Sequence, residues 1–187
     1  MSETAAGWKS SLQKLDASIG NAERLLAGIF CGLLCLLIAL NILVRMLRIP
    51  VFWVDEVAIY CMVWMAFLAA GSAVQSSEHV AVDILTKFLP EKVCSILDVV
   101  VTLILFAIGI ALIICAWIWF DPIGILASGG NAELFAERNL NFIYSEPTAS
   151  FEAPKALFWL VMPIFSLSLC FHAAVKLIAP TSKAGEA

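Results

Sequence analysis

Four long apolar runs dominate the pattern of hydrophobic and polar positions along the chain. They cover residues 25–44, 57–77, 99–120 and 156–175, and none of them contains Asp, Glu, Lys or Arg. A helix needs about 20 apolar residues to cross the roughly 30 Å hydrocarbon core of a bilayer. Because the bilayer core offers no water, each segment must satisfy its own backbone hydrogen bonds, which favours helices. The pattern therefore predicts an all-α integral membrane protein with four transmembrane helices.

The segment before the first apolar run, residues 1–24, has a different periodicity. Trp8, Leu12, Leu15 and Ile19 are spaced by four, three and four residues, which places them on one face of a helix. Charged side chains occupy much of the remaining surface. We therefore predict an N-terminal amphipathic surface helix that lies on the membrane. The alternative is that this segment simply extends the first span into water.

Polar segments divide the chain into three parts. We expect a cytoplasmic amphipathic segment over residues 1–24, a transmembrane domain over 25–179 and a cytoplasmic tail over 180–187. The longest connection is the loop 121–155, in which Asn131 is an acceptable N-cap for a short helix.

The distribution of Lys and Arg predicts which side of the membrane each segment faces. Basic residues are enriched in the cytoplasmic loops of membrane proteins. The N-terminal segment, the middle loop and the C-terminal tail hold seven of the 11 basic residues, and the other two loops hold four. We therefore expect both termini to be cytoplasmic and the loop 121–155 to be periplasmic.

Composition and charge support a membrane protein and exclude a nucleic-acid partner. Of the 187 residues, 62% are hydrophobic and 14% are charged, against about 45–50% and about 25% in soluble domains. The formal net charge of −4 leaves no long basic run to follow a phosphate backbone. Cys31 and Cys35 lie one helical turn apart, so a bridge or metal site can be imagined, but small apolar roles are typical of such cysteines.

The apolar runs lack the groups that ion coupling or catalysis needs. An ion-coupled transporter usually carries an ionisable site at membrane depth, whereas here only His172 interrupts the fourth run, near its cytoplasmic end. Haem ligation by His79 and His172 is not expected, because His79 lies at a helix end. No hydrolase, metalloprotease or phosphate-binding motif is present. We therefore predict a protein that is not an enzyme, with no catalytic residue, no metal and no cofactor.

Small residues recur at helical spacing in two of the runs. Gly28 and Gly32 form a GxxxG pair in the first run, and Ala66 and Ala70 form a similar pair in the second. Small residues let helix backbones approach closely in lipid. These faces serve either packing among the four helices or docking of a partner membrane protein, and the sequence leaves both open.

The stretch from Asn41 to Leu89 combines polar and aromatic positions in a distinctive order. A polar residue and an Arg end the first run, and a Trp and an acidic pair precede the second. A further Trp and a Gly lie inside the second run, and a His and an Asp follow it. The positions are Asn41, Arg45, Trp53, Asp55, Glu56, Trp64, Gly71, His79 and Asp83. This order resembles the small membrane subunit (DctQ-like) of TRAP transporters, the tripartite ATP-independent periplasmic family.

The resemblance implies a scaffold subunit of a secondary transporter in the bacterial inner membrane, which imports an organic acid by sodium symport. It implies two partners besides membrane lipid, a large membrane subunit (DctM-like) and a periplasmic substrate-binding protein (DctP-like). The matching residues are then candidates for contact with the large subunit.

Physical chemistry offers the motif residues simpler roles. Asp55 and Glu56 lie at a helix N-terminus, where negative charge is favourable, and either can pair with Arg45 or Arg48. The alternative function is a self-contained small four-helix transporter that acts as a homodimer. A third possibility is a membrane-bound enzyme or redox subunit.

Overall fold

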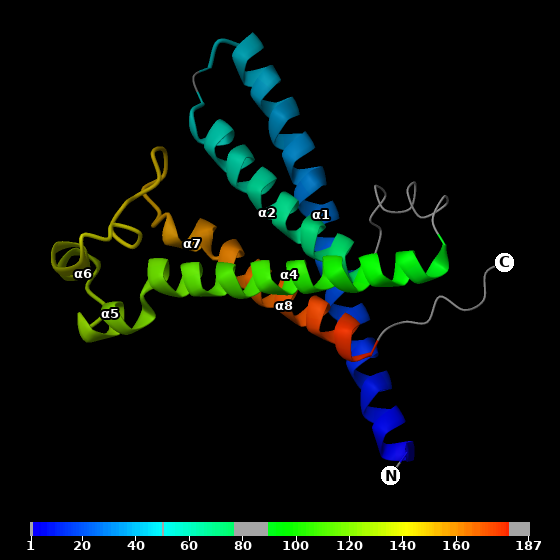
Figure 1. Cartoon of the computed structure of the whole chain (residues 1–187). Helices are drawn as coiled ribbons and strands as arrows, with labels where there is room; N and C mark the ends of the chain where they lie inside the picture. Colours follow the sequence, from blue (N-terminus) through cyan, green and yellow to red (C-terminus); the bar gives the residue numbers. More distant parts are fainter. Residues whose placement is uncertain (1, 50, 77–89, 180–187) are drawn as a thin grey trace.

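The computed structural model describes residues 2–49, 51–76 and 90–179, and this part of the chain is built from helices (Figure 1). Four of its segments are long and apolar enough to cross a membrane, namely Gly7–Met46, Trp53–Ser76, Lys92–Ala127 and Ala156–Ile178. The predicted all-α membrane fold is confirmed, and the described residues contain no strand, only an isolated bridge between Pro147 and Pro154. The helices are α1 (Ser2–Met46), α2 (Trp53–Ser76), α4 (Glu91–Phe120), α5 (Pro122–Ala127), α6 (Ala132–Asn139), α7 (Ala156–Trp159) and α8 (Val161–Ile178).

The predicted N-terminal helix is present, and it continues into the first span without a break. α1 runs from Ser2 to Met46 as one helix of 45 residues. No proline lies within it to remove a backbone hydrogen bond. The amphipathic segment is therefore an extension of the first span, and its position on a membrane surface stays a prediction.

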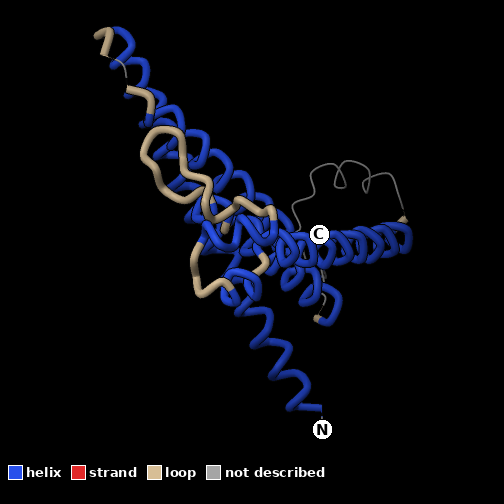
Figure 2. The backbone as a smooth tube through the Cα atoms, turned by 90° about the vertical axis from the view of Figure 1, so that its left-hand side faces the viewer, coloured by secondary structure: helices blue, strands red, loops and turns tan. Residues whose placement is uncertain are grey.

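The four long helices form two antiparallel pairs that cross each other. α1 packs along α2, and α4 packs along α8 (Figure 1). α8 also contacts α2 and α1, so it connects the two pairs. The N-terminal end of α1 projects beyond the other helices in both views (Figure 2).

Apolar side chains pack between α1 and α2 and also cover the outside of the helices. Leu37, Val54 and Cys61 form a buried cluster between these two helices. Leu36 and Ile118 are 65% and 69% exposed, as expected of helix surfaces that face lipid. The bridge that can be imagined between Cys31 and Cys35 does not form, since both are exposed free thiols.

The loop between the third and fourth spans is folded rather than extended. Asp121 ends α4 in a left-handed conformation (φ 36°), and its side chain accepts a hydrogen bond from Gly124 N at 2.9 Å, which caps α5. Asn131 caps α6 by accepting from Glu133 N at 2.9 Å and Leu134 N at 3.1 Å, which confirms the short helix predicted there. A cluster of buried residues holds the loop to the helix ends: Phe120, Phe135, Ile143 and Ala156.

Candidate functional site

A polar cluster closes the turn between α1 and α2. Arg45 Nη2 lies 3.0 Å from Asp55 Oδ2, and Arg45 Nε donates to Asn41 Oδ1 at 3.0 Å. Asn41 Nδ2 also donates to Asp55 Oδ1. The pairing predicted for Asp55 is therefore confirmed, although exposed pairs of this kind contribute only about 0–1 kcal/mol. The Arg45 and Asp55 side chains are 71% and 50% exposed, so the cluster is accessible to a partner.

Glu56, the second member of the acidic pair, holds the folded loop instead of an arginine. Its two carboxylate oxygens accept hydrogen bonds from Ala149 N and Ser150 N, both at 2.8 Å. Tyr60 also donates its hydroxyl hydrogen to Glu56, at 3.3 Å. Of the two acidic residues, Asp55 is the one that pairs with an arginine, whereas Glu56 binds the loop, which returns to the start of α2 and presents two backbone donors there.

The two other motif residues inside α2 serve contacts within the chain. Trp64 Nε1 donates to the Phe158 carbonyl oxygen at 2.9 Å, which ties α2 to α7. Gly71 is buried, and a Cβ at this position would lie 2.8 Å from both carboxylate oxygens of Glu23. Trp53, in contrast, is 47% exposed at the start of α2. The motif therefore separates into residues that pack inside the chain and residues left at its surface.

The four small residues proposed for helix packing are exposed. A Cβ at Gly28 or Gly32 would meet no atom within 4 Å, and Ala66 and Ala70 are exposed on α2. The packing between α1 and α2 therefore does not use these pairs, and their role in docking a partner stays a prediction. His79 and Asp83 lie outside the described residues.

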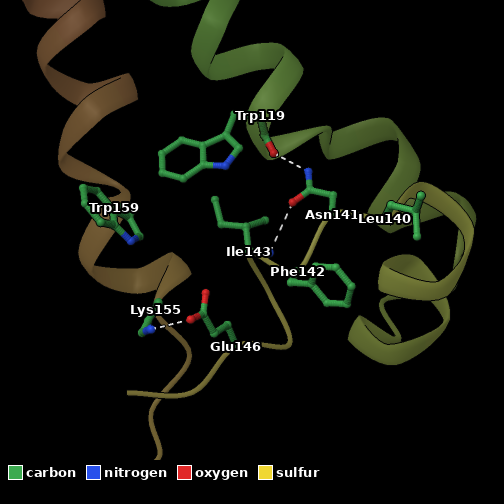
Figure 3. Close-up of a pocket in the computed structure, with 8 residues that line it drawn as sticks. All are labelled: Trp119, Leu140, Asn141, Phe142, Ile143, Glu146, Lys155 and Trp159. Atoms are coloured by element: carbon green, nitrogen blue, oxygen red, sulfur yellow. Dashed lines mark hydrogen bonds and ion pairs between the residues drawn. The ribbon is translucent and has the colours of Figure 1, made fainter. Parts of the chain in front are cut away.

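A pocket of about 340 Å³ lies where the folded loop meets the helix ends (Figure 3). Asn141 bridges its wall by donating to the Trp119 carbonyl oxygen at 2.7 Å and accepting from Ile143 N at 3.2 Å. Lys155 Nζ lies 2.5 Å from Glu146 Oε1, and this hydrogen bond raises the pKa of Lys155. Because these polar groups bond to each other or to the backbone, they hold the loop against the helix ends, and we interpret the pocket as part of the loop's packing and not as a ligand site.

A buried junction joins α1 to α8, and sequence reasoning missed it. His172 contacts Asp16 and Glu23, and the Ser168 hydroxyl donates to Glu23. Glu23 precedes the apolar run that begins at Leu25, so the run itself gives no sign that this carboxyl group is buried. The signal available in the sequence was the spacing of Asp16 and Glu23, which are seven residues apart and so share one face of a helix.

These features define a multi-pass membrane protein whose described polar groups serve mainly to hold its own helices and loop together. Residues 34–182 match the family model described as tripartite ATP-independent periplasmic transporters, DctQ component. The chain belongs to this DctQ family, which is a component of transporters and not a family of enzymes, and it resides in the bacterial inner membrane.

One relative adds to this assignment. The chain is 32% identical over 89 residues to the sialic acid TRAP transporter permease protein SiaT of Haemophilus influenzae (strain 86-028NP). The match covers 47% of this chain and 14% of that protein, so it spans about one seventh of the relative's length. No solved structure matches the chain.

Proposed function

We propose that this chain is the small scaffold subunit of a TRAP-type secondary transporter that imports an organic acid using a sodium gradient. A DctM-like large membrane subunit would move the substrate, and a DctP-like periplasmic protein would deliver it. The observation that carries the proposal is the match to the DctQ family over residues 34–182.

The length of the SiaT relative supports a large membrane partner. In that permease the region similar to this chain is 14% of the polypeptide, so most of the protein lies outside the match. In SiaT, a segment similar to this chain is therefore joined in one polypeptide to a much longer sequence. We infer the same association for this chain, as a separate subunit.

The contacts made by three acidic residues of the helices support a coupling-ion site that lies outside this chain. Glu23 bonds to His172, Glu56 holds the loop, and Asp98 pairs with Lys176 at 2.8 Å. A carboxylate that binds a transported cation must be able to offer its oxygens to that cation. Because these three are engaged within the chain, we place the coupling ion and the substrate in the large subunit.

The exposed faces of the α1–α2 pair are the proposed docking surface. Gly28 and Gly32 on α1 leave a shallow face that a partner helix can approach closely, and Ala66 and Ala70 offer a second one on α2. The exposed Arg45 cluster at the turn supplies polar contacts at the end of the same pair. With both termini cytoplasmic, this turn and the loop 121–155 would face the periplasm, where the substrate-binding protein arrives.

Purification of a tagged chain together with its genomic neighbours tests the association. We expect a large hydrophobic protein to co-purify with the chain. The G28L/G32L double variant should lose at least about tenfold of that partner, because two leucines would separate the docked helices, while its own fold has room for them. The matched control is A107L/A111L, which enlarges an exposed pair of small residues on α4.

Two outcomes would contradict the proposal. The first is recovery of the wild-type chain alone, folded and monodisperse, from cells that also make the neighbouring proteins. The second is transport by the purified chain alone in liposomes, which would favour the self-contained homodimer. Equal partner loss in G28L/G32L and A107L/A111L would leave the subunit role in place but remove the α1 docking face.

A further inference from the structure

A cluster of ionisable side chains is buried where α1, α2 and α8 meet. The imidazole of His172 is fully buried, with Nδ1 at 2.6 Å from Asp16 Oδ1 and Nε2 at 3.2 Å from Glu23 Oε2. Ser168 donates its hydroxyl hydrogen to Glu23 Oε1. Gly71 of α2 makes room for the Glu23 carboxylate, since a Cβ there would lie 2.8 Å from it. Three helices thus enclose one imidazole between two carboxyl groups.

This geometry requires one proton more than the deprotonated groups carry. A neutral imidazole has one N–H donor and one acceptor nitrogen, whereas an ionised carboxylate only accepts. Two ring–carboxyl hydrogen bonds need two hydrogens, and a neutral His172 supplies one of them. The second sits on the ring, because an imidazole is more basic than a carboxyl group. The cluster is then an imidazolium between the Asp16 and Glu23 carboxylates.

The surroundings leave this proton without a competing charge. α2 contributes Gly71 and the amide of Gln75, which lie against α1 and carry no charge. On α8 the next basic group is Lys176, which is bonded to Asp98 of α4 at 2.8 Å. The Asp16 side chain is 14% exposed, against 9% for Glu23 and none for His172, so Asp16 is the end of the cluster closest to the surface.

We propose that Asp16, Glu23 and His172 form a proton-binding site that holds the N-terminal half of α1 against α8. With the proton bound, both ring nitrogens donate and both contacts are closed. When the proton leaves at alkaline pH, one ring nitrogen and its carboxylate face each other without a hydrogen, and two carboxylates remain, of which Glu23 is buried and Asp16 is partly exposed. That contact then opens, and the α1 segment before the first apolar run loosens from the bundle.

Amide hydrogen exchange of the full chain in lipid nanodiscs tests this proposal between pH 6 and pH 10. Rates for residues 7–22 are divided by the intrinsic exchange rate at each pH. In the wild type we expect protection of this segment to fall by about tenfold or more as pH rises, the fold-change of one charge-assisted hydrogen bond. In E23Q the amide is a permanent donor to the ring nitrogen of neutral His172, so protection should stay constant.

The control and a second measurement separate this site from a general effect of pH. D55N makes the same kind of change in the exposed Arg45 cluster and should keep the wild-type profile. Independently, ring nitrogen resonances of ¹⁵N-histidine in the H79Q chain, whose one histidine is His172, should show two N–H groups at neutral pH. One of them should disappear in the pH interval in which the segment loosens.

Three results would overturn the proposal, and two of them need no variant of the cluster. One is a flat exchange profile in the wild type. Another is an E23Q profile as steep as that of the wild type. The third is a His172 ring that keeps a single N–H across the whole pH range.

Discussion

The folded loop 121–155 should depend on a single aromatic side chain. Phe135 is fully buried, packs edge-on against Tyr144 with ring centroids 5.4 Å apart, and belongs to the cluster that joins the loop to Phe120 and Ala156. Truncation of a buried Phe to Ala typically costs about 3–5 kcal/mol. The cost falls on local opening of the loop, because the long helices keep their own contacts.

Hydrogen exchange resolved by segment measures that local opening. A loss of about 3 kcal/mol corresponds to roughly a 100-fold faster exchange, since each 1.4 kcal/mol is about tenfold. We therefore expect F135A to speed exchange in α5 and α6 by about two orders of magnitude and to leave α4 unchanged. F135L should restore most of the protection, because swaps that nearly conserve volume usually cost under about 1.5 kcal/mol.

The neighbouring Leu134 provides the matched control. It lies on the same helix and is 42% exposed, so L134A removes apolar volume without opening the cluster. Equal acceleration in L134A and F135A would refute the reasoning, since the effect would then follow from helix propensity and not from burial. Acceleration that spreads through α4 would refute it as well.

Three further predictions follow from single contacts. E56A should remove hydrogen-exchange protection from the amides of Ala149 and Ser150, which donate to the Glu56 carboxylate, and D55A should leave that protection unchanged. Amide hydrogen exchange of these two residues measures the effect of each variant. G109A places a Cβ 2.6 Å from Cys170 Sγ and should destabilise the α4–α8 pair by about 1–3 kcal/mol. Unfolding followed by circular dichroism measures this loss, and the G109A/C170A double variant should recover part of it. A G109A chain as stable as the wild type would contradict the packing of α4 against α8. Burial and the nearby Asp121 raise the pKa of the Tyr144 phenol above 10.0, so this hydroxyl stabilises the loop at lower pH and the contribution is lost as pH rises through the raised pKa. In a Y60F chain, in which Tyr144 is the remaining tyrosine, the midpoint of the rise in tyrosinate absorbance should therefore lie above pH 10.0.

The four spans could be predicted because each of them is one continuous apolar segment of the sequence. An apolar run of about 20 residues has one stable arrangement in a bilayer, so composition alone identifies it. The Arg45–Asp55 pair could be predicted for a related reason, since only a short turn separates its two residues. The N-cap at Asn131 is likewise a local signal.

The buried junction and the loop anchor could not be predicted, because they join residues far apart in the chain. His172 and Asp16 are 156 positions apart, and Glu56 and Ala149 are 93 apart. Which polar residue meets which depends on how α8 sits against α1 and α2, and no periodicity in one segment fixes that arrangement. The exposure of Gly28 and Gly32 could not be predicted for the same reason, because a GxxxG pair does not determine which helix packs against it.

The unbroken α1 helix has a mechanical consequence. Its 45 residues span about 68 Å at roughly 1.5 Å per residue, more than twice the hydrocarbon thickness. A helix of that length is longer than the hydrocarbon core is thick, so a large part of α1 must lie outside that core, on the membrane surface or in water. Because the backbone hydrogen bonds of α1 are continuous from Ser2 to Met46, the part outside the core and the part inside it form one stiff unit.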